Sequence, residues 1–441
     1  TADGGHRTVS PEQTLAAYER HVSPITGAVT VLRDVSADGG GLVRYTISAH
    51  ASPRPVGSLA GLRQALQEVS AGKGATNAQA RASGLCEALE RYSACAWGDE
   101  VRRPAAYRRL RASAIHPNDC MLFSARQHAA RAEWNARGSI HEQVPLPFDE
   151  DAEVDWTPVW SLTACEFRHL PTELCYAHTA AGAGGRRCLA DSNGNAAGNT
   201  VEEAILQGFL ELVERDGVGL WWYSRARRPA VDLDSFDDRH VQQLLGHYRV
   251  LGRDIWALDL TTDLGIPVFA AISRRVDQAR EEIVWGFGAH LDARIGVLRA
   301  LSELGQHLPR TWPEDRPGQS ERDPWVERWL AEATLAAQPY LAPGPGPARR
   351  RGDYADDWSD DLRDDVLRCQ ATVERRGMEL LVLDQTRPEI GLPVVKVIVP
   401  GLRHFRPRLA PGRLYDVPAA LGWVDRPLTE GELNPIPYRF P

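Results

Sequence analysis

Apolar residues recur every three to four positions in several stretches of the chain, which is the spacing of an amphipathic α-helix. The first such stretch opens with Ser10 as a possible N-cap, Pro11 at the first helical position and Gln13 as the partner of a capping box. The pattern predicts helices at about residues 10–25, 75–97, 124–136, 200–223 and 292–307.

Other stretches alternate apolar and polar residues, or form short apolar runs between turn residues, and these features are typical of β-strands. Strands and helices do not alternate regularly along the chain. The sequence therefore predicts a mixed α+β fold, with mixed β-sheets flanked by helices. Strands are expected at residues 27–50 (a pair around the DGGG turn), 158–164, 173–180, 255–262, 268–274, 379–386 and 394–401.

The segments between these elements also carry predictions. Residues 72–74 (GKG) are expected to form a turn, with Lys73 exposed, and residues 191–199 (DSNGNAAGN) a polar loop. Residues 309–357 are rich in Pro, Gly and charge, so we expect a mobile insertion there. The pattern shows no other break, and we expect one domain over residues 1–441 with a proline-rich tail at 434–441.

The composition excludes several classes of protein. A net charge of −8 over 441 residues argues against broad binding to a nucleic-acid backbone. The seven cysteines form no CxxC pair, so structural zinc and a secreted disulfide framework are poorly supported and a cytoplasmic location is expected. No apolar run approaches the length of a membrane span, so no membrane association is expected.

A short repeat, E-x-x-E-R, occurs once in each of two predicted helices, at residues 87–91 and 211–215. At about 100° per residue, the polar stripe of the second helix covers roughly a quarter of the helix circumference. One reading is a solvated acidic face, but such faces usually intersperse lysines, and neither helix contains one. The other reading is that the two stripes face each other and bind Mg²⁺ and a nucleotide. The stripe of the second helix consists of Glu203, Gln207, Glu211 and Glu214.

Residues 70–94 (SAGKGATNAQARASGLCEALERYSA) and 191–216 (DSNGNAAGNTVEEAILQGFLELVERD) resemble the two central motifs of the YcaO family. The C-terminal stretch from VVKVIVPG to LNPIP is similar to the azoline-forming cyclodehydratase branch of that family. The resemblance implies a YcaO-like ATP-binding fold in which Mg²⁺ ions on the acidic helices hold ATP without a P-loop. The sequence indeed contains no GxxxxGK[ST] pattern.

The resemblance also implies site residues. The family's metal-facing positions correspond to Glu87, Glu90, Glu203, Gln207, Glu211 and Glu214. Positions that contact the nucleotide or support those ligands correspond to Ser83, Arg91, Asn199, Arg215, Arg299 and Glu303, and an N-terminal pair to Arg7 and Thr14.

By resemblance, a Cys, Ser or Thr side chain of a ribosomally made precursor peptide adds to the preceding amide, and ATP phosphorylates the amide oxygen to give a thiazoline or oxazoline. The C-terminal carboxylate of Pro441 is the candidate base, as the tail of this branch points into the active site. Two alternatives stay open at this point: a YcaO enzyme that forms thioamides or amidines, and a non-catalytic scaffold that binds ATP or peptide.

The family pattern implies partners for the chain. These are the precursor peptide and a leader-binding or ThiF-like protein, either separate or on a portion that precedes Thr1. A flavin dehydrogenase that oxidises the rings is a further candidate partner. We also expect a homodimer.

Overall fold

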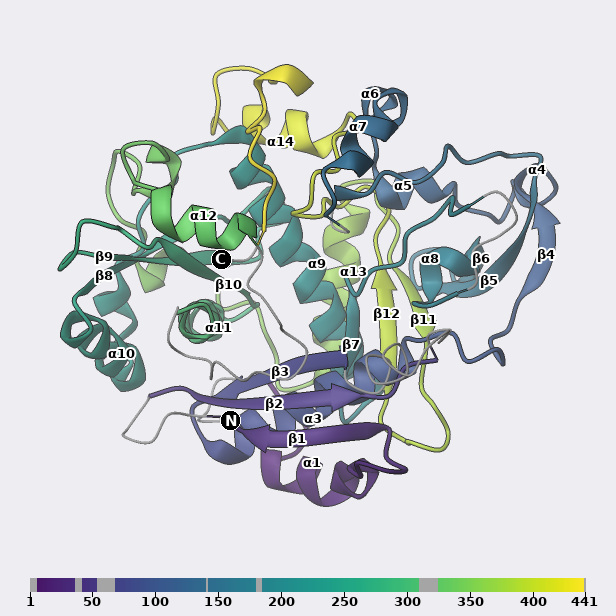
Figure 1. Cartoon of the computed structure of the whole chain (residues 1–441), viewed down its shortest axis with the longest axis horizontal. Helices are drawn as coiled ribbons and strands as arrows, with labels where there is room; N and C mark the ends of the chain where they lie inside the picture. The colour runs from purple at the N-terminus through teal and green to yellow at the C-terminus, as the bar shows by residue number, and fades with distance from the viewer. Residues whose placement is uncertain are drawn as a thin grey trace.

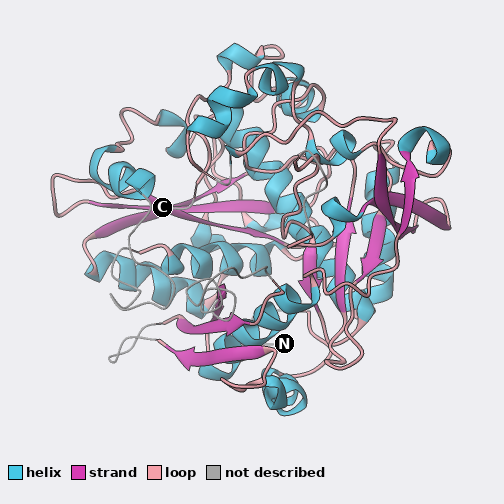
Figure 2. Ribbon diagram, turned by 45° about the vertical axis from the view of Figure 1, so that its right-hand side comes forward, coloured by secondary structure: helices cyan, strands magenta, loops and turns pink. Residues whose placement is uncertain are grey.

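The computed structural model describes residues 6–35, 42–53, 68–139, 142–179, 185–308 and 324–439. Three β-sheets, all with antiparallel strand pairs, are packed together by helices, as Figure 2 shows. The long helix α9 (Val201–Ser224) runs through the middle of the molecule, between two of the sheets (Figure 1). The prediction of a mixed α+β fold is confirmed. None of the helices among the described residues is long and apolar enough to cross a membrane.

The first sheet joins β1 (Val29–Asp34), β2 (Arg44–His50) and β3 (Glu68–Gly74), and its face is covered by α3 (Asn77–Ser93). The GKG segment belongs to β3, so the predicted turn there is wrong. A side chain on Gly72 would put its Cβ 2.1 Å from the backbone nitrogen of Gly84 in α3, which no side chain tolerates. Glycine is therefore needed for strand and helix to touch. The DGGG turn lies outside the described residues.

The helix predicted at residues 10–25 is shorter than expected. It consists of α1 (Pro11–Tyr18), followed by the 3₁₀ turn η1 (Glu19–His21). The capping box between Ser10 and Gln13 is present, as the sequence predicts.

The second sheet has the strand order β4-β5-β11-β12-β7, with β6 paired to β5. The strand predicted at 173–180 is wrong, because its first residues form the helical turn α8 (Thr172–Cys175) after β6, and residues 180–184 are outside the described part. Helix α9 packs on β12 and β7. The strands are β4 (Arg103–Ala106), β5 (Glu153–Ser161), β6 (Glu166–Pro171), β7 (Asn195–Ala197), β11 (Leu381–Asp384) and β12 (Val394–Ile398).

The third sheet has the order β10-β9-β8 and lies on the other side of α9. Helix α11 (Ala293–Gln306) packs on β10 and β9, and α10 (Arg239–Val250) on β8. The strand pair predicted around residues 255–274 is confirmed by the antiparallel register of β8 and β9. The strands are β8 (Arg253–Asp259), β9 (Val268–Arg275) and β10 (Val284–Ala289).

Smaller helices connect the sheets. The helix predicted at 124–136 is two short helices, α6 and α7, because Ala130 leaves the helical conformation between them. The short elements are α4 (Tyr107–Leu110), α5 (Pro117–Met121), α6 (Ala125–Ala129), α7 (Arg131–Ala136), η3 (Leu233–Phe236), α12 (Pro324–Glu332), η4 (Pro339–Leu341), η5 (Arg351–Asp353), α13 (Leu362–Glu374), α14 (Arg413–Ala420) and η6 (Glu430–Glu432).

An aromatic cluster lies at the C-terminal end of α9 and ties distant segments together. Trp222 contacts Trp285 of β10, Trp329 of α12 and Tyr438 of the tail, with ring centroids 5.2–5.9 Å apart. A mobile insertion was expected at residues 309–357, but buried side chains such as Trp329, Tyr340 and Tyr354 fix its described part to the core. Residues 309–323 lie outside the described part.

A buried ion-pair network fixes the same helix to the C-terminal region. The Asp216 carboxylate is fully buried and accepts bonds from the backbone N–H of Arg403 (2.9 Å) and from Arg413 Nε and Nη2 (3.1 and 2.6 Å). Arg413 also donates to Asp263, at 2.7 and 3.1 Å. Asp216, which follows the second E-x-x-E-R repeat, is therefore a structural residue rather than part of the acidic stripe.

Candidate active site between the two acidic helices

The acidic stripes of α3 and α9 lie close enough for their charges to interact. Burial raises the pKa of Glu90 to about 8, and Glu211 of α9 and Glu87 act in the same direction. Arg91 opposes them, with Nη2 3.5 Å from Glu87 and Nε 3.8 Å from Glu90. The arrangement gathers more carboxylate charge than one arginine neutralises, which is the chemistry of a cation site.

The end of the α9 stripe has the same design. Arg215 pairs with Glu214 at 2.7 Å and with Glu211 at 3.0 Å. Burial raises the pKa of Glu214 to about 7, and the nearby carboxylate of Glu303 adds to the effect. The backbone N–H of Gly194 donates to the second oxygen of Glu211 at 3.3 Å, so the polar loop before α9 also contacts the stripe.

The N-terminal segment closes the other end of the stripe. The Glu203 carboxylate, 1% exposed, accepts a bond from Arg7 Nη1 at 3.0 Å and two from Thr8, at 3.0 and 2.9 Å. Asn199 donates to the same carboxylate at 3.3 Å and accepts from the hydroxyl of Thr14 at 3.1 Å. The structure thus brings the predicted Arg7 and Thr14 to the site and adds Thr8, which the sequence pattern did not indicate.

Helix α11 supplies two of the residues predicted on the nucleotide side, Arg299 and Glu303. Arg299 donates to the side-chain oxygen of Gln207 at 2.7 Å, and Glu303 pairs with Lys73 of β3 at 2.8 Å. Although burial acts to raise it, the pKa of Glu303 is lowered by Lys73 and Arg215. The expectation that Lys73 is an exposed turn lysine is wrong, because β3 directs it to Glu303.

A buried lysine, which the sequence pattern did not indicate, donates hydrogen bonds to the loop before α9. Lys396 of β12, 4% exposed, donates to the carbonyls of Asp191 (2.7 Å) and Asn193 (3.2 Å) and to the side chain of Asn195 (3.1 Å). Its charge in the apolar run VVKVIV was the signal that could have found it.

The tail approaches the site. Trp285 Nε1 donates to the buried hydroxyl of Tyr438 at 2.9 Å. Burial raises the pKa of that hydroxyl well above its usual value; Glu303 acts in the same direction, and Arg215 opposes it. Arg439 bonds to Glu142. The candidate base, Pro441, lies outside the described residues.

The donor set fits Mg²⁺ and a nucleotide by its chemistry. Carboxylate oxygens are ligands that Mg²⁺ prefers, and the amide nitrogen of Gln207 is buried without a protein partner among the described residues. In that same part of the chain, no three acidic, His or Cys side chains already meet as a metal cage, because the carboxylates point to arginines. Ser83 lies on α3, one turn before Glu87, and is half-buried.

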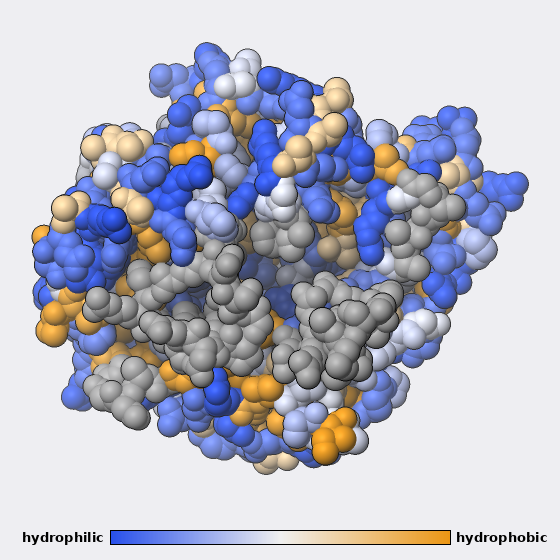
Figure 3. Space-filling model, viewed as in Figure 1, coloured by the Kyte–Doolittle hydropathy of each residue, from blue (hydrophilic) through white to orange (hydrophobic). Residues whose placement is uncertain are grey.

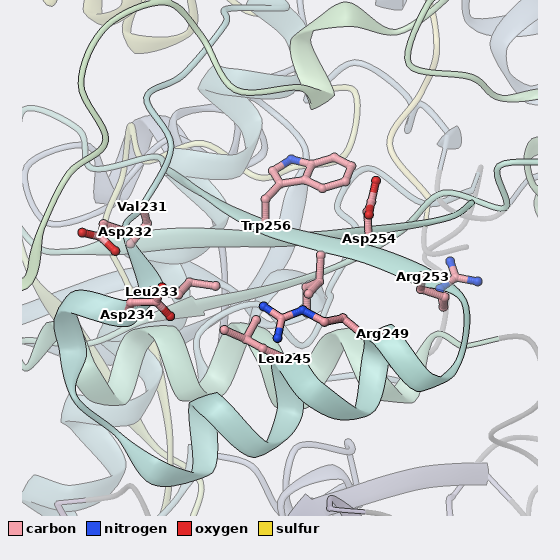
Figure 4. A pocket seen from close by; sticks show the side chains of 10 residues that line it. Val231, Asp232, Leu233, Asp234, Leu245, Arg249, Arg253, Asp254 and Trp256 are labelled. Atoms are coloured by element: carbon pink, nitrogen blue, oxygen red, sulfur yellow. The ribbon is translucent and has the colours of Figure 1, made fainter. Parts of the chain in front are cut away.

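The surface above this region is polar. Figure 3 shows a hollow near the middle of one face, with hydrophilic residues at its floor. A separate cavity of about 400 Å³ lies between η3, α10 and β8 and is lined by residues such as Asp232, Arg249 and Trp256 (Figure 4). It contains none of the predicted site residues, so it is distinct from the site between the acidic helices.

A protein-family model described as "YcaO cyclodehydratase", ATP- and Mg²⁺-binding, matches residues 71–403. A heterocyclase solved in complex with substrate and cofactor is 48% identical (TM-score 0.92), and the heterocyclase TruD is 45% identical (TM-score 0.80). They cover 99% and 98% of this chain, which spans only 58% and 55% of theirs. A YcaO protein from Methanopyrus kandleri, bound with AMPPCP and Mg²⁺, shares the fold at 22% identity (TM-score 0.62) over 91% of this chain and 95% of its own.

Proposed function

Because this chain belongs to the YcaO family, we propose that it is an ATP- and Mg²⁺-dependent cyclodehydratase acting on a ribosomally made precursor peptide. The products would be thiazolines from Cys and oxazolines from Ser or Thr. The observation that carries the proposal is the pair of partly buried, arginine-paired carboxylate stripes on α3 and α9. The similarity to two heterocyclases favours ring formation over the thioamide and amidine alternatives.

In the proposed reaction, the substrate side chain bonds to the preceding carbonyl carbon. The amide oxygen then takes the γ-phosphoryl group of ATP, with release of ADP. The ring closes when the side chain bonds to the carbonyl carbon, and the thiol or hydroxyl loses its proton at that step. Phosphate then leaves with the C–O electron pair, the nitrogen loses its proton and a C=N bond forms. An amide oxygen is a poor leaving group until it is phosphorylated. The hydrolysis of one ATP therefore accompanies the loss of one water from the peptide.

The roles follow the two stripes. Mg²⁺, when bound, would neutralise the phosphate oxygens and polarise the γ-phosphoryl group. Glu87, Glu90 and the stripe of α9 (Glu203, Gln207, Glu211 and Glu214) would hold the metal, whereas Arg91 and Arg215 are placed to move from carboxylate to phosphate oxygens. Ser83, Asn199, Arg7 and Thr14 would support the phosphates, and Arg299 and Glu303 the rest of the nucleotide.

The tail would supply the base. Tyr438, three residues before Pro441, is buried near enough to Glu303 and Arg215 for their charges to act on the pKa of its hydroxyl, which supports this assignment. We propose that the carboxylate of Pro441 accepts the proton from the reacting amide. A leader-binding or ThiF-like partner, and a homodimer of this chain, remain part of the proposal.

Mass spectrometry tests the function directly. The chain is incubated with ATP, Mg²⁺, the candidate precursor and the partner protein, and the peptide is then weighed. Loss of one water per modified residue is the expected result. A replacement of oxygen by sulfur would indicate a thioamide-forming enzyme, and an unmodified peptide with intact ATP would contradict the proposal in favour of a scaffold.

A further inference from the structure

The segment His404–Arg408 crosses the end of the site where the acidic stripe, the loop before α9 and the tail come together. The ring of Phe405 lies under the guanidinium of Arg215, 4.5 Å from its centroid, and 4.5 Å from the ring of Tyr438. The backbone carbonyl of Phe405 accepts the hydroxyl of Tyr223 at 2.8 Å. Phe405 therefore anchors the segment. The residues at the even-numbered positions around it are polar: His404, Arg406 and Arg408.

His404 is fully engaged inside the protein. Its Nε2 lies 3.2 Å from the Asp191 carboxylate, and its Nδ1 accepts the backbone N–H of Arg406 at 3.1 Å. The ring is therefore a neutral tautomer with the proton on Nε2. Since the histidine is neutral, Asp191 keeps its full negative charge at this position.

The charge of Asp191 acts on two arginines, Arg406 and Arg408, but forms no ion pair with either of them. The Arg406 side chain makes no hydrogen bond or ion pair with any residue that the structure describes, although it is only partly exposed. Arg408 is 5% exposed, stacks 4.0 Å over the ring of Phe123 and leaves its Nη1 buried without a partner in the described part of the chain. Burial lowers the pKa of both arginines, the cost expected of cations that lack counter-charges.

The neighbouring cations do not relieve this surplus. Besides burial, the charges of Arg215 and Arg91 lower the pKa of Arg406, so the three guanidiniums lie near enough to repel one another. Each of these two is already paired with glutamates of its own helix. A partly exposed guanidinium that has no ion-pair partner offers a planar fork of donors, and this geometry suits phosphate oxygens.

We propose that Arg406, with the neighbouring charge of Arg408, forms a second phosphate subsite. It would bind the phosphoryl group after its transfer from ATP, and then the inorganic phosphate that is released. This inference rests on the proposed function. Both arginines lie in the C-terminal stretch that resembles the azoline-forming branch, but no role was predicted for either of them. The place of the subsite agrees with the chemistry, because Arg406 lies near enough to Asp191, Arg91 and Arg215 for their charges to act on its pKa.

Phosphate binding to the full chain tests the subsite without any peptide. Inorganic phosphate is titrated calorimetrically into the unaltered protein, into Arg406→Gln and into Arg350→Gln, a matched control that removes a surface charge 71% exposed. We expect Arg406→Gln to weaken phosphate binding about tenfold or more, and Arg350→Gln to leave it unchanged. Arg406→Lys keeps the charge but not the fork and should fall between them.

A second titration identifies the source of the phosphate. AMPPCP with Mg²⁺ should bind Arg406→Gln within about threefold of the unaltered protein, because the γ-phosphate is held by the helices. Equal loss of AMPPCP and phosphate binding would overturn the inference and assign Arg406 to the nucleotide. Absent phosphate binding by the unaltered protein, or unchanged binding by Arg406→Gln, would also overturn it. Failure of the proposed function appears separately, as a peptide without rings.

Discussion

The carboxylate of Asp216 offers a sharp test of how the central helix is held. It accepts three hydrogen bonds at 2.6–3.1 Å and has no exposure to solvent. Removing one partner of a buried, hydrogen-bonded pair costs about 3–5 kcal/mol, because the other charge stays buried. Arg413 keeps its bonds to Asp263, so we expect Asp216→Ala to lie at the lower end, about 3 kcal/mol.

The assay is chemical and thermal unfolding followed by tryptophan fluorescence, since Trp221 and Trp222 are buried on the same helix. In a double-mutant cycle, Asp216→Ala and Arg413→Ala should be less than additive by about 2 kcal/mol, because each removes the same pairing. Asp254→Ala is the control. That carboxylate is 54% exposed and 3.4 Å from Arg274, so its loss should cost about 0.5 kcal/mol or less. A cost for Asp216→Ala as small as that of the control would refute the reasoning.

Four further outcomes are expected at the site. Glu214→Ala should abolish peptide-dependent ATP hydrolysis with an unchanged circular dichroism spectrum, and full activity would contradict the metal assignment. Lys396→Met should destabilise the chain by about 2–3 kcal/mol in urea unfolding and weaken AMPPCP binding, as it frees the loop before α9; Lys396 is dispensable if both values stay unchanged. Residues appended after Pro441 should slow ring formation more than ATP binding, and equal turnover would exclude the carboxylate as base. Burial lowers the pKa of His404 from 6.5 to about 4, so its contribution to stability is present above pH 6.5 and lost as the pH falls. Between pH 7 and pH 5, the free energy of unfolding of the unaltered chain should fall by about 2 kcal/mol more than that of His404→Gln. Parallel plots of this free energy against pH for the two proteins would contradict the prediction.

The elements that the sequence predicted well are those whose own pattern decides them. Helix α9 was predicted within one or two residues at each end, because its apolar stripe is long and Thr200 can cap it. The strands β8 and β9 were found for a similar reason, as two apolar runs flank a turn. In contrast, the GKG segment looked like a turn, and only the close packing of Gly72 against Gly84 shows why a strand needs glycine there.

The site was predicted in its residues more than in its contacts. The spacing of the E-x-x-E-R repeats placed the carboxylates on one face of each helix, but it could not show that arginines hold them. Partners such as Thr8 for Glu203 and Lys73 for Glu303 are 195 and 230 residues apart in sequence. No local pattern encodes such pairs. The structure also shows that Asp216, the acidic residue directly after the second repeat, has its side chain in the core.

The docking of the tail has a consequence for how the protein is made. Asn434 bonds to Trp222 and Tyr340, and Tyr438 fills the space between Trp222, Trp285 and Phe405. Until residues 434–438 have been synthesised, Trp222, in a helix made some two hundred residues earlier, lacks part of its cover. The nascent chain therefore depends on protection from aggregation until this segment has emerged. A chain truncated before Asn434 is expected to be degraded rather than to accumulate as a weak enzyme.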